Sequence, residues 1–110
     1  MSNLITVDES NFVAEVLEFK GKVLVDFYAD WCGPCKVLAP ELELLAAKYA
    51  ENETIKICKI DTEANYDLSI KYKVSSIPNV AYFDSGILQE QIIGLKPASV
   101  YESKLTDELA

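Results

Sequence analysis

Two cysteines separated by a glycine and a proline are the side chains of this 110-residue chain best placed to do chemistry. They lie in the segment Trp31-Cys32-Gly33-Pro34-Cys35-Lys36. At this spacing on the first turn of a helix, two thiols lie on the same side and close enough to bridge. The helix N-terminus has unpaired N–H groups and a partial positive charge, which favour thiolate over thiol, most of all for Cys32. The pair therefore predicts thiol–disulfide chemistry.

The residues around the two cysteines suit the start of a helix. Pro34 has no N–H to lose there and preorganises the turn, while Gly33 leaves room for another backbone to approach. Trp31 stands beside the first cysteine, which favours a role in docking a partner over plain packing. A structural cysteine pair, or half of an intersubunit metal site, is the alternative to a redox role.

A carboxylic acid, Asp26, stands inside an apolar run that spans residues 23–29. A charged carboxylate is costly to bury, so desolvation should raise the pKa of Asp26 and let it exchange a proton near neutral pH. The chain contains no histidine that could act as the base instead. The alternative is a structural carboxylate that only pairs with a buried lysine or a backbone group.

The third cysteine, Cys58, lies in another apolar run and is predicted to be a buried thiol that behaves as a small hydrophobe. An odd number of cysteines does not form a secreted disulfide framework. A structural zinc site usually needs four Cys or His ligands, which one subunit with three Cys and no His cannot supply. No metal is therefore expected.

The elements that must position these residues follow from the apolar spacing. A helix is predicted over residues 10–19, with Ser10 as its N-cap and Gly21 placed to end it. The run over residues 23–29 predicts a strand buried on both faces. A long amphipathic helix is predicted over residues 34–49, with a kink but no break near residues 36–40 because of Pro40. A strand over residues 55–60 completes a strand–helix–strand unit with parallel strands.

The second half of the chain predicts a hairpin between two helices. Asp61 or Thr62 is expected to cap a short helix containing Leu68 and Tyr72. Strands over residues 80–83 and 87–93 flank a short glycine-containing link and should pair antiparallel. The last helix begins at Pro97 and places these residues on one face: Ala98, Tyr101, Leu105 and Leu109. The predicted fold is α/β, with a parallel βαβ half and an antiparallel hairpin in one mixed sheet flanked by helices on both faces.

The composition indicates a single domain over residues 1–110. Half of the residues are apolar and 25% are charged, as in an ordinary globular protein. The net charge of -8 and the scattered basic residues argue against nucleic-acid binding, which needs clustered Lys and Arg. The first ten residues have no basic or apolar signal segment, and no run is long enough to span a membrane. A cytoplasmic protein without membrane contact is expected.

The chain resembles the thioredoxin family over nearly its full length. The hexapeptide agrees with the family motif without a change, and further matches occur in order at Asp26, Pro40, Ile60-Asp61, Ile77-Pro78, Phe83, Gly86 and Ile93-Gly94. The resemblance implies a thioredoxin fold and a protein-disulfide reductase active in cell redox homeostasis. It also implies that Cys32 is the exposed attacking thiolate, that Cys35 is the resolving thiol, and that Asp26 exchanges the proton of Cys35.

The resemblance further implies a docking surface and an electron donor. Ile77-Pro78 matches the family's cis-proline, which faces the disulfide and shapes a substrate groove. The other implied docking residues are Trp31, Gly33, Pro34, Ile93 and Gly94. The domain binds no cofactor itself, and electrons come from NADPH through a separate flavin-containing thioredoxin reductase. Its other partners are disulfide-containing target proteins, and a monomer is expected.

Three departures from the family pattern lie near the implied site. Ile57 stands where many members have a lysine close to the buried aspartate, and Lys59, on the same face of that strand, is a candidate replacement. The segment 61–78 is about two residues longer than usual and has Lys73 where glycine is common, and Asn79 replaces a typical threonine. The alternative interpretations of the function are a disulfide oxidant or isomerase, and a binding module whose thiols are incidental.

Overall fold

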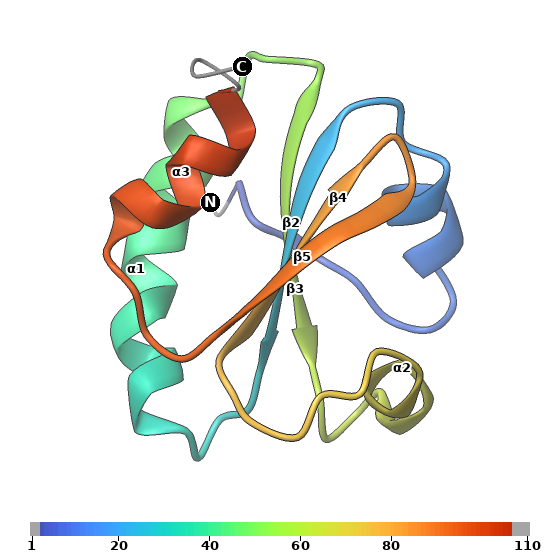
Figure 1. Ribbon diagram of the computed structural model, residues 1–110, viewed down its shortest axis with the longest axis vertical. Coiled ribbons are helices and arrows are strands. Elements are labelled where there is room, and N and C mark those ends of the chain that lie inside the picture. The colour runs from blue at the N-terminus through green and yellow to red at the C-terminus, as the bar shows by residue number, and fades with distance from the viewer. Residues whose placement is uncertain (1–2, 107–110) are drawn as a thin grey trace.

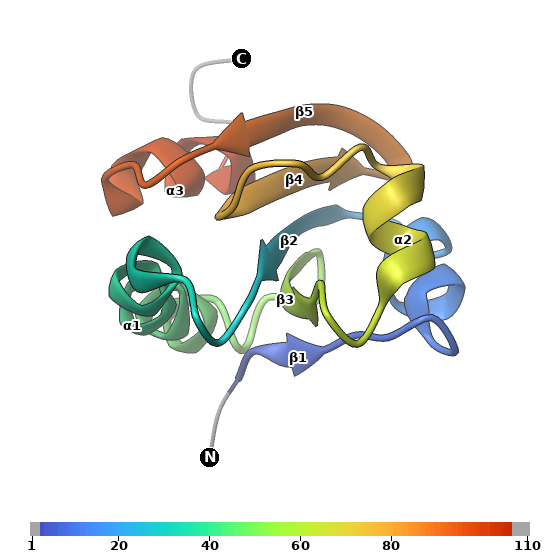
Figure 2. The ribbon, with the colours of Figure 1, turned by 90° about the horizontal axis from the view of Figure 1, so that it is seen from below.

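A five-stranded mixed sheet with helices on both faces forms the fold (Figure 1). The structure is a computed structural model that describes residues 3–106. In chain order the elements are β1 (Ile5–Thr6), the π-helical turn η1 (Val13–Leu17), β2 (Lys22–Tyr28), α1 (Gly33–Lys48), β3 (Ile55–Asp61), α2 (Tyr66–Lys71), β4 (Asn79–Asp84), β5 (Ile87–Ile93) and α3 (Ala98–Thr106). Figure 2 shows α1 and α3 on one face of the sheet, and α2 with the turn η1 on the other.

The strand order β1-β3-β2-β4-β5 places β2 in the centre of the sheet. Strand β2 runs parallel to β3 and antiparallel to β4, and β4 and β5 form an antiparallel hairpin. These pairings confirm the predicted mixed sheet, with its parallel βαβ half and its hairpin. Strand β1, which pairs parallel with β3, was not predicted. A two-residue strand is too short to show an alternating apolar pattern.

The central strand divides the core into two clusters. Side chains alternate along β2, so Leu24 packs under α1 and α3 while Val25 and Phe27 pack on the face covered by η1 and α2. Asp26 has the same parity as Leu24. The only carboxylate of β2 therefore lies on the face that α1 covers.

Two predicted helix caps are wrong. The first helix is only the turn η1, and the carboxylate of Asp8 accepts hydrogen bonds from the backbone N–H groups of Ser10 at 2.8 Å and Asn11 at 3.2 Å. The N-cap of η1 is Phe12, which makes no side-chain capping bond, and Asp8 instead closes the turn that precedes η1. Helix α2 begins after Asn65, not after Asp61 or Thr62.

Gly21 does not end the first helix either, because the turn ends at Leu17. The glycine instead packs against the carbonyl of Thr54, where a Cβ would lie 2.3 Å from the oxygen. Its role is a close backbone approach beside the start of β2.

The other predicted elements are confirmed. Helix α1 runs without a break through Pro40. The last helix, α3, buries Tyr101 and Leu105 as predicted, while Leu109 lies outside the described residues. Within residues 3–106, no helix has the length and apolar character needed to cross a membrane.

Candidate active site at the start of helix α1

The two cysteines lie at the start of α1, just after the loop that follows β2. Cys32 is the N-cap of α1, and its Sγ accepts a hydrogen bond from the backbone N–H of Cys35 at 3.2 Å. Pro34 occupies the first turn, as predicted. The two cysteines form a disulfide, with their Cα atoms 5.2 Å apart. The first helical turn thus holds the pair in bonding geometry and directs an N–H group at the first sulfur.

Both cysteines are buried in this disulfide form. Cys32 is 4% exposed and Cys35 is 3% exposed, because they pack with Ala29 and against Tyr28 and Ile77. The expectation that Cys32 is an exposed residue is therefore wrong for the oxidised protein. The exposed neighbour is Trp31, whose side chain is 68% accessible.

A second loop faces the disulfide. The Ile77–Pro78 peptide bond is cis, as the family resemblance implied. Cys32 Sγ lies 3.8 Å from the carbonyl oxygen of Ile77, so the reduced thiol is within reach of that acceptor. This contact places the predicted proline loop directly beside the sulfur of Cys32.

A third segment, at the end of β5, joins the proline loop. The backbone N–H of Gly94 donates a hydrogen bond to the carbonyl of Pro78 at 2.9 Å. Gly94 has a φ of 90°, and a Cβ built on it would meet nothing within 4 Å. A Cβ on Gly33 would also meet open space. The backbone is therefore bare and accessible on two sides of the disulfide, beside the half-exposed side chain of Ile93.

Asp26 lies buried beneath this surface, with 4% of its area exposed. Its Oδ1 has no hydrogen-bond partner among the described residues. Burial raises the pKa of Asp26 from 3.8 to about 7, and the opposing effect of the Lys59 charge is smaller. Lys59 is the register partner of Asp26 on β3, and both side chains lie on the same face of the sheet.

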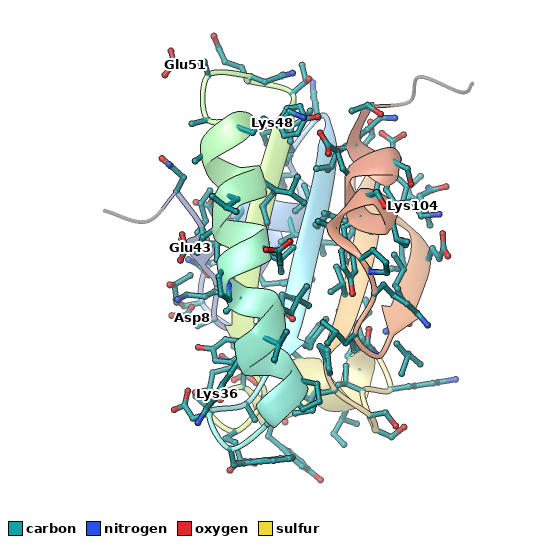
Figure 3. The ribbon with its side chains drawn as sticks, turned by 90° about the vertical axis from the view of Figure 1, so that its left-hand side faces the viewer. Asp8, Lys36, Glu43, Lys48, Glu51 and Lys104 are labelled. Atoms are coloured by element: carbon teal, nitrogen blue, oxygen red, sulfur yellow. A yellow bond between two sulfur atoms is a disulfide. The ribbon has the colours of Figure 1, made fainter. Side chains whose placement is uncertain are left out.

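A cleft of ≈ 150 Å³ connects these groups. Asp26, Cys35 and Lys59 all line it, so the buried carboxyl and Cys35 share one space. Lys36 and Glu43 of α1 also line it, and Figure 3 shows both along the flank of this helix. The cleft offers a route between the carboxyl group and solvent.

The third cysteine is chemically quiet. Cys58 is fully buried and unpaired, and burial raises the pKa of its thiol to about 12. The predicted role as a small core hydrophobe is confirmed. Across the part of the chain that the structure describes, no group of three or more His, Cys, Asp or Glu side chains is arranged to hold a metal ion.

The sequence pattern assigned Tyr101 to the core and gave it no further part. The structure places its hydroxyl against the backbone of residues 94–96, beside the predicted docking residues. A signal was present, because a tyrosine at an apolar helix position carries a hydroxyl that needs a partner when buried. Which partner the hydroxyl finds depends on the path of the segment between β5 and α3.

A redox-active cysteine pair at a helix N-terminus, facing a cis-proline on a mixed sheet, defines a protein-disulfide oxidoreductase. Comparison with known sequences agrees with this class: the family model described as Thioredoxin matches residues 3–107. The chain is 39% identical over 98 residues to Thioredoxin C-2 of Corynebacterium nephridii, covering 89% of each protein. It is 36% identical over 108 residues to a thioredoxin of Mycolicibacterium smegmatis, covering 98% of this chain and 96% of the relative.

A relative of another kind is the Bifunctional thioredoxin reductase/thioredoxin of Mycobacterium leprae. The identity is 36% over 103 residues, which cover 94% of this chain and 22% of that longer protein. The chain belongs to the thioredoxin family. It is a disulfide reductase that works through the Cys32–Cys35 pair, and members of this family carry their electrons on the dithiol without a bound cofactor.

Proposed function

We propose that Cys32 attacks the disulfides of target proteins and that Cys35 resolves the mixed disulfide. The observation that carries this assignment is the position of Cys32 as N-cap of α1 beside the carbonyl of Ile77, with Cys35 one turn deeper. The N–H of Cys35 that points at Cys32 Sγ would stabilise a thiolate there. The sulfur of Cys32 contacts the carbonyl of the proline loop that the target is proposed to cross.

The proposed reaction has two balanced steps. The Cys32 thiolate attacks one sulfur of the target disulfide, forms a mixed disulfide and releases the other target sulfur as a thiolate. Cys35, as a thiolate, then attacks Cys32 Sγ, closes the internal disulfide and releases the second target sulfur. Two electrons thus pass from the dithiol to the target. The second step is intramolecular, so the mixed disulfide is short-lived.

Asp26 is proposed to take the proton of Cys35 during the second step. The two side chains line the same cleft, and the pKa of Asp26 is raised by burial to about 7. A carboxyl group with this pKa can accept and release a proton near neutral pH. The cleft supplies the path by which the proton then leaves to solvent.

The target is proposed to bind as an extended segment across Trp31, Gly33, Pro34, Ile77, Pro78, Ile93 and Gly94. Trp31 and Ile93 supply exposed apolar surface, with 68% and 53% of their areas accessible. The open backbone at Gly33 and Gly94 lets another chain approach closely. Such a surface recognises backbone shape and apolar side chains, so it suits many different disulfide proteins.

The oxidised pair is proposed to be reduced by a thioredoxin reductase that carries flavin and takes electrons from NADPH. The relative in Mycobacterium leprae supports this partner, because its name combines a reductase with a thioredoxin in one protein. We further propose that the chain acts in the cytoplasm as a monomeric single domain, with neither nucleic acid nor membrane as a partner. Its acidic net charge of -8 disfavours both kinds of anionic surface.

Insulin reduction with dithiothreitol as donor tests the assignment without assuming a partner. We expect Cys32→Ser to lower the rate to that of dithiothreitol alone, whereas Cys58→Ala, the matched loss of the buried thiol, keeps the activity of the folded protein. Insulin reduction by Cys32→Ser at the wild-type rate would refute the role of Cys32. A reduction potential high enough to oxidise target dithiols would favour the oxidant or isomerase reading instead.

Alkylation of the reduced protein tests the state of the Cys32 sulfur directly. At neutral pH, iodoacetamide should modify Cys32 first and leave Cys58 unmodified until the protein unfolds, because Cys58 is buried and its pKa is raised to about 12. Mass spectrometry of peptides at successive times measures both rates. Alkylation of Cys32 no faster than that of a free cysteine would contradict the thiolate mechanism.

A further inference from the structure

The hydroxyl of Tyr101 connects helix α3 to the segment that follows β5. Its ring is fully buried, and its Oη donates a hydrogen bond to the carbonyl of Gly94 at 3.2 Å. The same oxygen accepts a hydrogen bond from the backbone N–H of Lys96 at 3.1 Å. Burial raises the pKa of Tyr101, so the hydroxyl keeps its proton and remains a donor at neutral pH.

These two hydrogen bonds continue toward the disulfide. Gly94, whose carbonyl meets Tyr101, donates its own N–H to the carbonyl of Pro78 at 2.9 Å. Pro78 follows Ile77, whose carbonyl lies 3.8 Å from Cys32 Sγ. A continuous series of contacts therefore runs from the core side of α3 through both loops to the reactive sulfur.

Ile93, the last residue of β5, is still paired with Asn79 in the sheet, but the segment beyond it has little side-chain burial to fix its backbone. Ile93 and Leu95, on either side, are 53% and 44% exposed, so their side chains add little burial. Gly94 itself has no side chain, and its φ of 90° belongs to a region that glycine reaches freely among several others. Beyond the pairing of Ile93, the hydrogen bonds to the N–H and carbonyl of Gly94 are therefore what restricts the conformation of the glycine.

Both polar backbone groups of Gly94 are thus occupied inside the protein. What Gly94 offers a target is its open Cα face, where a Cβ would meet nothing within 4 Å. The orientation of that face depends on the peptide plane whose carbonyl Tyr101 holds. Without that hydrogen bond the peptide plane is free to rotate, and the orientation of the open Cα face changes with it.

We infer that Tyr101 is a positioning residue, whose hydroxyl holds the backbone of Gly94 and Lys96 so that an extended segment of a target protein can pass the disulfide. The inference rests on the proposed docking role of this loop. It assigns Tyr101 to the recognition of protein disulfides, and it leaves the exchange chemistry of the cysteine pair to the residues already described.

Tyr101→Phe removes the hydroxyl and keeps the ring. In steady-state insulin reduction with dithiothreitol, KM should rise about fivefold and kcat should stay within about twofold. The reason is that the Gly94 segment is no longer held in place for docking, while the sulfur chemistry is unchanged. Reduction of a small aromatic disulfide, dithiobis(nitrobenzoic acid), should keep its wild-type rate, since that molecule is too short to lie across Gly94. Tyr82→Phe is the matched control, because Tyr82 packs on the same core cluster and its hydroxyl bonds neither loop.

Amide hydrogen exchange supplies a readout of the hydrogen bonds themselves. In Tyr101→Phe the amides of Gly94 and Lys96 should exchange faster, while amides in β2 keep their protection. An insulin KM equal to that of the wild type, or equal losses toward insulin and the small disulfide, would overturn the positioning role. Failure of the wild-type protein to reduce insulin would instead refute the proposed function, so the two failures are distinguishable.

Discussion

At the scale of single residues, the environment of Asp26 sets its chemistry. The carboxyl is 4% exposed, and its Oδ1 lacks a hydrogen-bond partner within the described part of the chain. Desolvation therefore outweighs the nearby positive charge of Lys59, and the pKa rises to about 7. An ordinary aspartate becomes a group that titrates in the range where thiol–disulfide exchange operates.

The pH profile of disulfide exchange should change when this carboxyl is removed. In the wild type we expect an inflection near pH 7, the pKa of Asp26. Asp26→Asn should lose that inflection and slow insulin reduction at neutral pH by at least about tenfold, because it removes the proposed base of Cys35. Asp84→Asn, which removes a carboxylate outside the cleft, is the control. An unaltered profile in Asp26→Asn would show that the carboxyl takes no part.

Lys59 should hold down the pKa of Asp26. The two residues are register partners, line one cleft, and interact through their charges. Lys59→Met removes the positive charge, so the pKa of Asp26 should rise further and the inflection should move to higher pH. Lys56→Met is the matched control, because Lys56 faces the other side of β3 and pairs with Glu15. Equal profiles in both variants would exclude an electrostatic role for Lys59.

At the scale of elements, the hairpin turn is held against the turn η1. Gly86 has a φ of 82°, and a Cβ there would lie 2.1 Å from the carbonyl oxygen of Leu17. The β4–β5 turn and η1 therefore touch backbone to backbone. A side chain at this position must shift one of them.

Gly86→Ala should destabilise the fold by about 3 kcal/mol, from the unfavourable φ together with the clash on Leu17. Gly33→Ala is the matched control for stability, since a Cβ there meets open space and alanine favours the helix. Its change should stay within about 0.5 kcal/mol. Urea denaturation of the oxidised proteins measures both, and equal stabilities would contradict the close approach at Gly86.

The long elements could be predicted from the sequence, while short ones depend on their neighbours. Helix α1 shows a repeated apolar spacing over 16 residues, and the run within β2 is apolar except for Asp26. Strand β1 has two residues, and it exists because β3 offers an edge to pair with. The turn η1 begins at Val13, after a separate turn in which Asp8, and not Ser10, accepts from the backbone N–H groups.

At the scale of the whole molecule, the buried carboxyl links stability to pH. In the unfolded chain Asp26 has its ordinary pKa of 3.8, and in the folded chain the pKa is about 7. As pH rises, the unfolded state loses this proton first. The stabilisation from the protonated group is therefore fully present below pH 3.8 and is lost as pH rises through about 7.

Asp26→Asn should gain stability relative to the wild type as pH rises from 5 to 8. The difference between the two pKa values corresponds to about 4 kcal/mol at full titration, of which about 2.6 kcal/mol falls between pH 5 and 8. Denaturant unfolding of both oxidised proteins at several pH values measures this gain, with Asp84→Asn as the control. A constant difference between Asp26→Asn and the wild type over this range would show that the carboxyl titrates normally in the folded state.

The sequence by itself determined the chemistry and the class of fold. The spacing of Cys32 and Cys35 before a helical pattern specifies a bridging pair, and the apolar run around Asp26 specifies a buried acid. These are local properties, because a helical turn and a strand fix which neighbours share a side. The family resemblance extended them to the proline loop and its partners.

Only the tertiary structure decided how distant segments meet. It buries Cys32 against Tyr28 and Ile77 and places Lys59 opposite Asp26 in the register of β2 and β3. It also brings the hydroxyl of Tyr101 to the carbonyl of Gly94. No local spacing encodes such contacts. These contacts depend on strand register and on the paths of the loops beside α1 and α3. The packing of the whole core sets both.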